Sequence, residues 1–414
     1  MTSLPGLEAR LYSTLPHQQT ILLKEATRIA NRLELPTYLV GGAVRDLFMK
    51  QPITDLDLVV EGDANLLANA LATALGGEVL AHSQFGTTKL RVFGQSIDVV
   101  TARQESYRRP GALPTVHPGT IAQDLKRRDF TINAMAMRLG PGSIQLLDPT
   151  NGQGDITAGL VRILHPTSFQ DDATRILRAI RYEQRLRFQL EQHTEALLSR
   201  HVEILNTISG DRLRRELDLI FREEHAGDIL LRAANLGVLS TLNPYLPDAL
   251  TLQDQLRRLS QEGGAILPQQ YLALLAYSTK DDQRDGFIQR LNMTRTWARV
   301  VRDVSLARDA ADFLAREPSP VMAYRLLNPL NLKAIRTVAA LTQNKPARDS
   351  LSLYLRELQH VRPMLNGHDI ANLGVPPGPQ VGALLEALRD ARLEGKVHTR
   401  EHEEAFILTS LQGS

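Results

Sequence analysis

The sequence predicts a mixed α/β head followed by a long region that is almost entirely helical. Two observations support this fold class. Strand-like and helix-like segments alternate from about residue 17 to 145. Beyond roughly Asp155, Leu, Ala and Arg dominate at helical spacing, and Pro and Gly clusters separate the helices. Alternation followed by helices alone is typical of an α/β domain joined to an all-α part.

The head is expected to begin with an amphipathic helix at 17–33 and to contain another at 61–75. Alternating or continuous apolar runs predict its strands, at 38–40, 54–60, 89–93, 96–100 and 143–147. We expect four parts along the chain, which are a head at 1–155, a neck at 156–235, a body at 236–361 and a tail at 362–414.

Composition restricts the class of protein. The 414 residues, 43% hydrophobic and 23% charged, are typical of a globular protein with several domains. The absence of cysteine excludes disulfides and thiolate metal sites, and it agrees with the cytoplasmic location that we expect. Neither a signal-like start nor an apolar run of membrane length is found, so we expect no membrane partner. The net charge of +2 does not by itself predict nucleic-acid binding, which must rest on local basic surfaces.

The most informative stretch begins with a strand, a glycine turn and a helix. Tyr38–Val40 reads as a short buried strand that ends at Gly41-Gly42, and 43–49 has helical character. Residues without Cβ let backbone amides approach a ligand closely, and a helix N-terminus favours phosphate. Arg45 adds a permanently charged, forked group in the first turn. The turn therefore predicts a phosphate site.

Two aspartates follow in the strand predicted at 54–60. Asp55 and Asp57 are two positions apart, so on a strand they share a face. Carboxylates in this arrangement are suitable ligands for one or two Mg²⁺ ions that bridge to phosphates. A solvated strand face would also alternate, but it has no reason to place carboxylates beside a Gly-Gly-x-x-Arg turn. The combined phosphate-and-metal interpretation is therefore favoured.

A third carboxylate, Asp98, lies in the strand predicted at 96–100. It would complete a metal-binding set with Asp55 and Asp57. An aspartate that caps the end of a strand explains its position equally well, and the sequence leaves both interpretations open.

A basic run at 126–128 precedes Asp129 and an apolar, helix-prone segment at 130–136. Arg128 could hold a triphosphate bidentately, and Asp129 could accept a hydrogen bond from a ribose hydroxyl. From charge spacing alone, an N-capping aspartate beside a solvated basic run is the favoured explanation.

A fourth segment, 171–181, places acidic and basic residues at spacings of three. On a helix these form one ridge, made of Asp172, Arg175, Arg178 and Arg181. An Asp and an Arg side by side can match the hydrogen-bonding edge of a base. Surface pairing within the helix, worth only ~0.3–0.5 kcal/mol per pair, explains the same spacing and would be favoured if the segment stood alone.

The order and wording of these segments resemble the class II tRNA nucleotidyltransferases, the family of CCA-adding enzymes and bacterial poly(A) polymerases. The matching stretches are GGAVRD with DLD at 41–57, RRDFTINAMA at 127–136, LLDPTNGQGDITAGLVRILHP at 146–166, DDATRILRAIRY at 171–182 and ISGDRLRREL at 208–217. The stretch at 366–388 resembles the tail of the family less specifically.

The resemblance implies a polymerase-β-like nucleotidyltransferase head and an elongated helical neck, body and tail. It implies template-independent transfer of CMP and AMP, from CTP and ATP, to the 3′ end of tRNA with Mg²⁺ as cofactor. The neck-to-body helices from 209 to 216 onward would carry the acceptor stem and elbow of the tRNA.

The resemblance also implies a role for each matching residue. Asp55 and Asp57 would bind Mg²⁺, with Asp98 as a weaker candidate. The residues that would hold the nucleotide divide into a triphosphate pair (Gly42 and Arg45), a phosphate-and-ribose pair (Arg128 and Asp129), a base-reading pair (Asp172 and Arg175) and two supporting arginines (Arg178 and Arg181).

Two departures leave alternatives open. Asp171 stands where the family motif usually has Glu, and the linker at 101–120 is Pro-rich where full CCA-adding members have a flexible loop that governs the switch from C to A. A CC-adding enzyme that works with a separate A-adding enzyme is therefore an alternative, and poly(A) addition is another. A fused phosphohydrolase would need more metal ligands than His368-Asp369, which reads as a helix start. A small-molecule nucleotidyltransferase would not need the long helical body.

Overall fold

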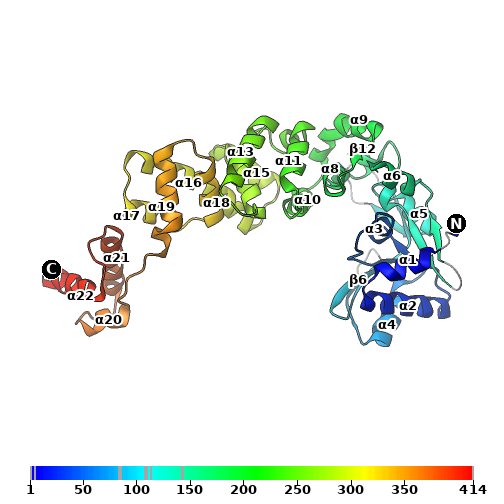
Figure 1. Ribbon diagram of the computed structural model, residues 1–414, viewed down its shortest axis with the longest axis horizontal. Coiled ribbons are helices and arrows are strands. Elements are labelled where there is room, and N and C mark those ends of the chain that lie inside the picture. The colour runs from blue at the N-terminus through cyan, green and yellow to red at the C-terminus, as the bar shows by residue number, and fades with distance from the viewer. Residues whose placement is uncertain are drawn as a thin grey trace. The chain divides into compact units, whose positions relative to one another are not determined.

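The computed structural model describes residues 2–3, 6–82, 86–106, 111, 114–140 and 144–412. The chain divides into two compact units. The first comprises Met1–Glu216 with Leu236–Thr241, and the second comprises Leu217–Asn235 with Leu242–Ser414. The first unit contains the sheet and the second is helical, which confirms the predicted fold class (Figure 1). Within the described ranges, no helix is long and apolar enough to cross a membrane.

An eight-stranded sheet forms the centre of the first unit, in the order β1-β10-β9-β2-β3-β6-β5-β4. Strands β3 and β6 pair in parallel, and the other neighbours pair antiparallel. The strands are β1 (Thr2–Ser3), β2 (Thr37–Val40), β3 (Asp57–Val60), β4 (Glu78–His82), β5 (Thr87–Val92), β6 (Gln95–Thr101), β9 (Ala136–Leu139) and β10 (Gln145–Leu147).

The register of three strands brings charged residues together. Asp57 at the start of β3 lies beside Asp98 in β6, and Asp98 lies opposite Lys89 in β5. A two-residue turn, Phe93-Gly94, joins β5 to β6, and both residues have positive φ, 52° and 75°. Such a turn matches the twist of a hairpin and fixes which residues pair.

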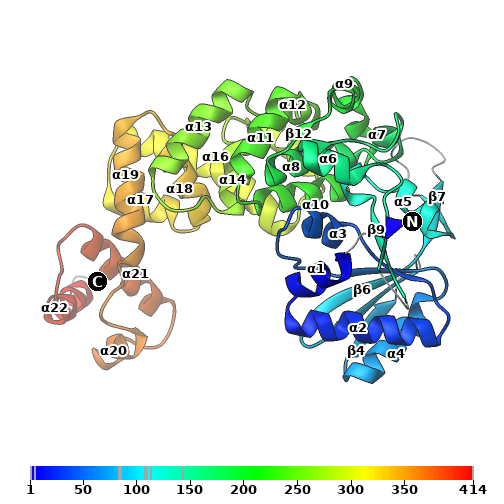
Figure 2. The ribbon, with the colours of Figure 1, turned by 45° about the vertical axis from the view of Figure 1, so that its right-hand side comes forward.

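Apolar side chains cover both faces of the sheet, because successive residues of a strand point to opposite sides. Leu39 belongs to the larger core, whereas its neighbours Tyr38 and Val40 belong to the smaller one. The larger core packs against α1 (Leu7–Thr14), α2 (His17–Arg32), α3 (Gly42–Phe48) and α4 (Ala64–Leu75) (Figure 2). The smaller core packs against α5 (Ile121–Lys126).

Two sequence-based assignments are wrong. The strand predicted at 54–60 begins only at Asp57, because the residues before it have no partner in β2 or β6, so Asp55 precedes the strand. The helix-prone segment at 130–136 forms a short 3₁₀ turn, η1 (Thr131–Asn133), and then enters β9. Pairing with β2 and β10 outweighs the helical preference of this apolar run.

The Pro-rich linker forms a separate hairpin of β7 (Arg103–Ser106) and β8 (Thr115–Pro118). Residues 107–110 and 112–113, within the segment predicted as a loop, lie outside the described residues. After the sheet, the first unit continues with α6 (Gly152–Ala158), β11 (Leu160–Val161), α7 (Ser168–Asp171), α8 (Thr174–Leu186), β12 (Gln189–Leu190), α9 (Gln192–His201) and η2 (Val202–Thr207). Helix α10 (Gly210–Phe221) belongs to both units.

The second unit is a succession of helices. Its longest helix, α16 (Arg295–Arg316), packs against several others of the unit. The helices are α11 (Ala226–Asn235), α12 (Val238–Leu242, shared with the first unit), α13 (Ala249–Gln261), α14 (Pro268–Ala276), α15 (Asp281–Arg290), α17 (Pro320–Leu327), α18 (Leu332–Leu341), α19 (Lys345–Arg356), α20 (Gly367–Asn372), α21 (Pro379–Leu393) and α22 (Arg400–Gln412), with the 3₁₀ turn η3 (Leu358–His360).

The last helices, from α20 onward, have a hydrophobic core of their own, which includes Leu365, Ile370 and Leu388. Buried Glu403 accepts hydrogen bonds from the backbone N–H groups of Met364 and Leu365. His368-Asp369 lies in the first turn of α20, as predicted for a helix start. The boundaries predicted at 155, 235 and 361 are finer than the two units and stay predictions.

Candidate active site

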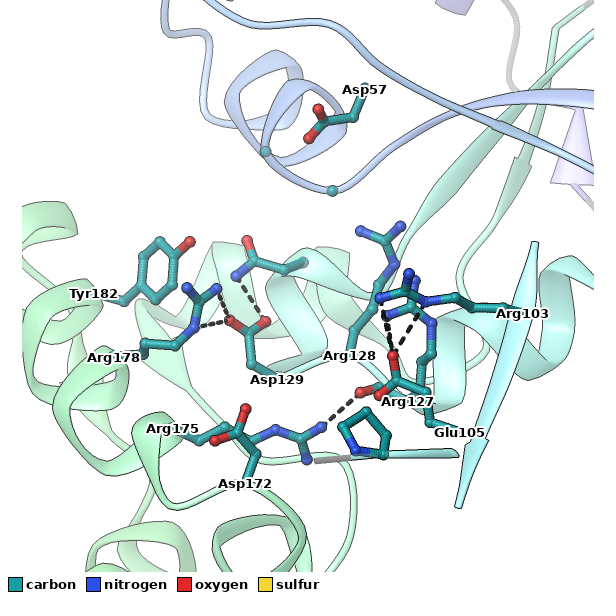
Figure 3. Close-up of a pocket in the computed structure, with 14 residues that line it drawn as sticks. Asp57, Arg103, Glu105, Arg127, Arg128, Asp129, Asp172, Arg175, Arg178 and Tyr182 are labelled. Atoms are coloured by element: carbon teal, nitrogen blue, oxygen red, sulfur yellow. Dashed lines mark hydrogen bonds and ion pairs between the residues drawn. The ribbon is translucent and has the colours of Figure 1, made fainter. Parts of the chain in front are cut away.

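A pocket of about 440 Å³ lies in the first unit, between the turn after β2, the start of β3, the β7–β8 hairpin, the segment after α5 and helix α8 (Figure 3). Its lining is rich in arginine and aspartate. The lining residues that the sequence predicted are Gly42, Asp57, Arg128, Asp129, Asp172, Arg175 and Arg178. Those that it did not single out for a site are Gly41, Arg103, Glu105, Pro114, Arg127, Asn133 and Tyr182.

The glycine turn is shaped by a close approach of Arg128. Gly41, the N-cap of α3, has φ 66° and ψ −126°, a conformation that L residues rarely adopt. A Cβ on Gly41 would also lie 2.8 Å from Nη1 of Arg128. At Gly42 a Cβ would meet only Nη2 of Arg45, at an ordinary 3.6 Å. Of the two glycines of the predicted turn, the position that requires glycine is therefore Gly41, whereas the resemblance gave a role to Gly42.

Asp57 points into the pocket from the start of β3 (Figure 3). The Asp57 side chain is exposed at the start of the strand, but the walls of the pocket partly desolvate its carboxyl and raise its pKa. Arg128 opposes the shift, whereas the carboxylates of Asp98 and Asp55 add to it. A carboxyl held above its ordinary pKa beside other carboxylates is a place where bound positive charge would be stabilised.

The three predicted metal ligands are neighbours but do not converge. In the described parts of the chain, no three Asp, Glu, His or Cys side chains are grouped as a metal site. Oδ1 of Asp98 lies 3.4 Å from Nζ of Lys89, an ion pair along the register of the sheet. Mg²⁺ usually takes one or two protein carboxylates and completes its shell with water and substrate phosphates. Asp57 with Asp55 fits that requirement, and Asp98 has a structural partner of its own.

Arg128 is held in place by the fully buried carboxylate of Asp124. Oδ2 of Asp124 accepts from Nε and Nη2 of Arg128, at 3.2 and 3.0 Å. Oδ1 accepts from Nε and Nη2 of Arg127, at 3.0 and 2.7 Å. Burial alone would raise the pKa of Asp124, but the two guanidinium groups lower it. Because Asp124 engages these two nitrogens, Nη1 of Arg128 extends toward Gly41.

Asp129 is bonded on both oxygens. Oδ2 accepts from Nε and Nη2 of Arg178, at 3.0 and 2.5 Å. Oδ1 accepts from Nδ2 of Asn133 and from the backbone N–H of Phe130. Although burial opposes ionisation, Arg178 and these donors lower the pKa of Asp129 to about 2. Asp129 is therefore an anion that orients Arg178, which lies over the ring of Tyr182 with 5.6 Å between guanidinium and centroid.

Asp172 does not lie on the helical ridge that the sequence predicted. It has extended backbone at the end of α7, and its Oδ1 accepts from the N–H and the hydroxyl of Thr174 at the start of α8. The same oxygen accepts from Nη2 of Arg212, at 2.6 Å. The ridge prediction failed because a side chain that caps a helix must precede it.

Arg175 is buried and is held by main-chain oxygens. Its Nη2 donates to the carbonyl of Arg127 at 2.6 Å, and its Nη1 donates to the carbonyl of Ser168 at 3.3 Å. Arg175 and Asp172 lie close together at one side of the pocket (Figure 3), but each has its own partners. A fixed donor and a fixed acceptor are thus presented together.

Four predicted residues do not line this pocket: the carboxylates Asp55 and Asp98 and the arginines Arg45 and Arg181. Arg45 is buried and donates to Asp46 and, at 2.8 Å, to Oδ1 of Asn133. Arg181 lies 5.7 Å from the ring centroid of Tyr182. Both arginines therefore contact residues that line the pocket and do not line it themselves.

Comparison with known proteins gives the family. Residues 37–162 match the model of the poly A polymerase head domain, and 187–250 match that of the probable RNA- and SrmB-binding site of polymerase A. An A-adding tRNA nucleotidyltransferase of Halalkalibacterium halodurans is 33% identical over 94% of this chain and 92% of its own length. The chain belongs to the class II tRNA nucleotidyltransferase family.

Other members of the class II family match over different shares of their length. An A-adding enzyme of Geobacter sulfurreducens is 34% identical over 94% of this chain, which spans only 47% of that protein. A CC-adding enzyme of Deinococcus radiodurans is 32% identical, covering 89% of this chain and 88% of its own. CCA-adding enzymes of three lactic acid bacteria match at 27–30% identity.

Solved structures of CCA-adding enzymes share the fold along the whole chain. That of Thermotoga maritima in complex with tRNA has a TM-score of 0.78 and 28% identity, covering 99% of this chain and 100% of that one. Others hold ATP or CTP, with TM-scores of 0.78 and 0.77. The tRNA, ATP and CTP are ligands of these related enzymes.

Some pocket residues without a predicted role lie inside or next to a motif of the class II family, which could have identified them. Arg127 and Asn133 stand inside the stretch RRDFTIN, and Tyr182 follows Arg181 directly. Arg103 and Glu105 lie outside these stretches, and what brings them to the pocket is the pairing of β7 with β8 and their contacts with Asp124 and Arg127.

We expect Gly41→Ala to lower the free energy of unfolding by about 1–3 kcal/mol, because Ala is strained at this φ and ψ and its Cβ would displace Arg128. Urea denaturation followed by circular dichroism measures this loss. Gly42→Ala is the matched control, since its Cβ meets only an ordinary contact, and it should leave stability unchanged or slightly higher. Equal stability of the two variants would contradict a close approach at Gly41.

We expect Asp129→Asn to destabilise the protein by about 2 kcal/mol near neutral pH, from the lowered pKa of this carboxyl. Because the folded pKa lies below the unfolded one, the stabilisation is present above the unfolded value and is lost as pH falls toward about 2. Urea denaturation at several pH values should show the difference between the two proteins shrinking below about pH 4.

The control for this series is Asp63→Asn, the same charge change at the exposed N-cap of α4, where Asn caps as well as Asp. Its effect should be small at every pH. If the difference in the free energy of unfolding between wild type and Asp129→Asn stays constant across the acid range, the partners of Asp129 do not lower its pKa.

Proposed function

We propose that this chain adds nucleotides to the 3′ end of tRNA, using CTP and ATP as donors. The observation that carries the proposal is the pocket itself. It sets the carboxylate of Asp57 opposite a group of fixed guanidinium groups, and a fixed acceptor and donor, Asp172 and Arg175, lie at its side. Family membership and the tRNA, ATP and CTP complexes of related enzymes support the same reaction.

The residues would divide the work by charge. Asp55 and Asp57 would hold Mg²⁺, which lowers the charge of the triphosphate and stabilises the attacking and leaving oxygens when it is bound. Nη1 of Arg128 extends toward Gly41, where phosphate oxygens would meet both an arginine and the first N–H groups of α3. Arg178 is aimed by Asp129 at the same space. Asp98, Arg45 and Arg181 would act through these residues.

Base selection would rest on Asp172 and Arg175. A base is recognised by hydrogen bonds whose donors and acceptors are fixed before it binds. The pocket holds Asp172 with Arg212 and Thr174, and it holds Arg175 with two carbonyls. Binding a mismatched base would leave one of these groups without a partner, which costs about 1–3 kcal/mol. The neck, body and tail predicted at 156–235, 236–361 and 362–414 would carry the tRNA.

There are two main candidates for which nucleotides the protein adds to the tRNA end. Synthesis of the whole C-C-A end is the product that the sequence motifs predict. Addition of the terminal A alone is the second candidate, because A-adding enzymes match at 31–34% identity, CC-adding enzymes at 29–32% and CCA-adding enzymes at 27–30%. In the sequence analysis, an A-adding enzyme enters only as the separate partner of a CC-adding enzyme. CC-only addition and poly(A) addition are the remaining alternatives.

Incorporation on defined transcripts separates these products. Labelled CTP and ATP would be offered singly and together, with Mg²⁺, to tRNA transcripts that end at the discriminator base or in C-C. We expect ATP to extend the C-C transcript by one nucleotide. If the transcript that ends at the discriminator base is also extended to C-C-A, the protein is a full CCA-adding enzyme. If that transcript is not extended, the protein is an A-adding enzyme. Arrest at C-C, long A tracts on unstructured RNA, or no incorporation would each overturn A addition to tRNA.

Asp57→Ala should reduce incorporation by about a thousandfold or more, because a carboxylate ligand of the reacting centre is lost. The raised pKa of Asp57 means that its charge opposes folding, so the thermal midpoint of the variant should be unchanged or higher. Asp63→Asn in the same unit should retain wild-type incorporation. Wild-type incorporation by a folded Asp57→Ala protein would remove Asp57 from the mechanism.

A further inference from the structure

A second recess, about 430 Å³ in volume, lies entirely within the helical unit. Three helices begin at it: α14, α16 and α18 each contribute residues from the cap or first turn. The end of α10 and the residue that follows it close another side. The lining is Asp218, Arg222, Leu267, Pro268, Gln269, Leu272, Thr294, Thr296, Trp297 and Lys333.

The chemistry of this recess combines an aromatic surface with positive charge. Trp297, the single tryptophan of the chain, packs on Phe221 with 5.5 Å between ring centroids, and Leu267 and Leu272 extend the apolar surface. Lys333 and Arg222 supply two cations. The structure therefore offers an apolar surface for a ring beside groups that bind an anion.

Two further details favour an anion. The side chain of Leu267, the N-cap of α14, cannot cap the helix, and Gln270 accepts only from the N–H of Leu267 itself. The positive end of this helix dipole therefore faces the recess. Arg222 donates through Nε and Nη2 to Asp218, so its third nitrogen, Nη1, extends beyond the ion pair. Asp218, the only acid of the lining, pairs with Arg222, so Lys333 leaves the lining with a net positive charge.

We propose that this recess binds one unpaired nucleotide of the tRNA substrate, with the base against Trp297 and the phosphate at Lys333 and Arg222. The proposal rests on the proposed tRNA reaction. Charge complementarity commits the site to RNA, since a polyanion carrying flat rings meets both cations and the aromatic surface. The α10 side of the recess also falls within the 187–250 segment that matches the RNA- and SrmB-binding model. The site would anchor tRNA far along the chain from the residues of the catalytic pocket.

Because Trp297 is the only tryptophan, its fluorescence reports on this recess alone. We expect tRNA to quench it with the same midpoint as tRNA binding in a gel-shift assay, since a stacked base quenches an indole. CTP with Mg²⁺ alone should leave the signal unchanged, because we place that nucleotide in the first unit. Full tRNA binding in the gel-shift assay without quenching would overturn the site.

Lys333→Glu tests the phosphate contact. Glutamate in the first turn of α18 suits the helix dipole, so the fold should be kept. We expect tRNA affinity to fall by about fivefold or more and the salt slope of binding to fall by about one. Lys345→Glu, the same change in the first turn of α19 outside the recess, is the matched control and should bind as wild type. Equal losses in both variants would show a general charge effect and overturn the site.

Trp297→Leu tests the stacking contact. It should weaken tRNA binding by about tenfold, whereas Trp297→Phe, which keeps a ring against Phe221, should retain most of the affinity. Equal affinity of all three proteins would overturn the base contact. Binding of CTP with Mg²⁺, which we place in the first unit, should be the same in wild type and variants. If tRNA fails to bind wild type in the gel-shift assay, the tRNA reaction itself is refuted, and this site with it.

Discussion

One buried carboxylate, Asp124, organises the wall of the catalytic pocket. It is inaccessible to solvent and binds two arginine side chains, Arg127 and Arg128. A buried charge is tolerated only where its partners satisfy it, so the arginines are required by the acid as much as they are held by it. From this centre the contacts spread outward, since Arg127 also donates to Glu105 of the β7–β8 hairpin and its carbonyl accepts from Arg175. Loss of Asp124 would therefore disturb three walls of the pocket together.

The pocket is prepared for charge before any ligand binds. Asp129 fixes Arg178, Arg212 fixes Asp172, and main-chain carbonyls fix Arg175. Groups oriented in advance need no rearrangement when charge develops on a reacting phosphate, which is the main source of electrostatic catalysis. The helical unit carries none of these contacts, and its own recess combines an aromatic ring with cations. We therefore place the reacting groups in one unit and a tRNA contact in the other.

The sequence predicted the fold class and much of the pocket because these features depend on local patterns. The Gly-Gly turn, the Asp-x-Asp pair and the RRD run can each be recognised from residues that are adjacent or nearly adjacent in the chain. What failed depended on distant contacts. Asp172 does not lie on the predicted helical ridge, because its side chain caps the start of α8. The segment after Asp129, predicted to be helical, leads into strand β9 because β9 pairs with β2. Arg103 and Glu105 reach the pocket through the hairpin and through contacts with Asp124 and Arg127, which no local pattern encodes.

The two-residue turn between β5 and β6 has an evolutionary consequence. Because Phe93-Gly94 sets the pairing of β6 with β5, it also decides which face of the sheet carries Asp98 beside Asp57. A single inserted residue that shifted this register would turn every side chain of β6 to the opposite face. The apolar residues Ile97 and Val99 would then leave the larger core and the acid would point toward it, so selection should remove such insertions at this turn. Descendants of this chain are expected to vary in the identity of the turn residues while keeping their number.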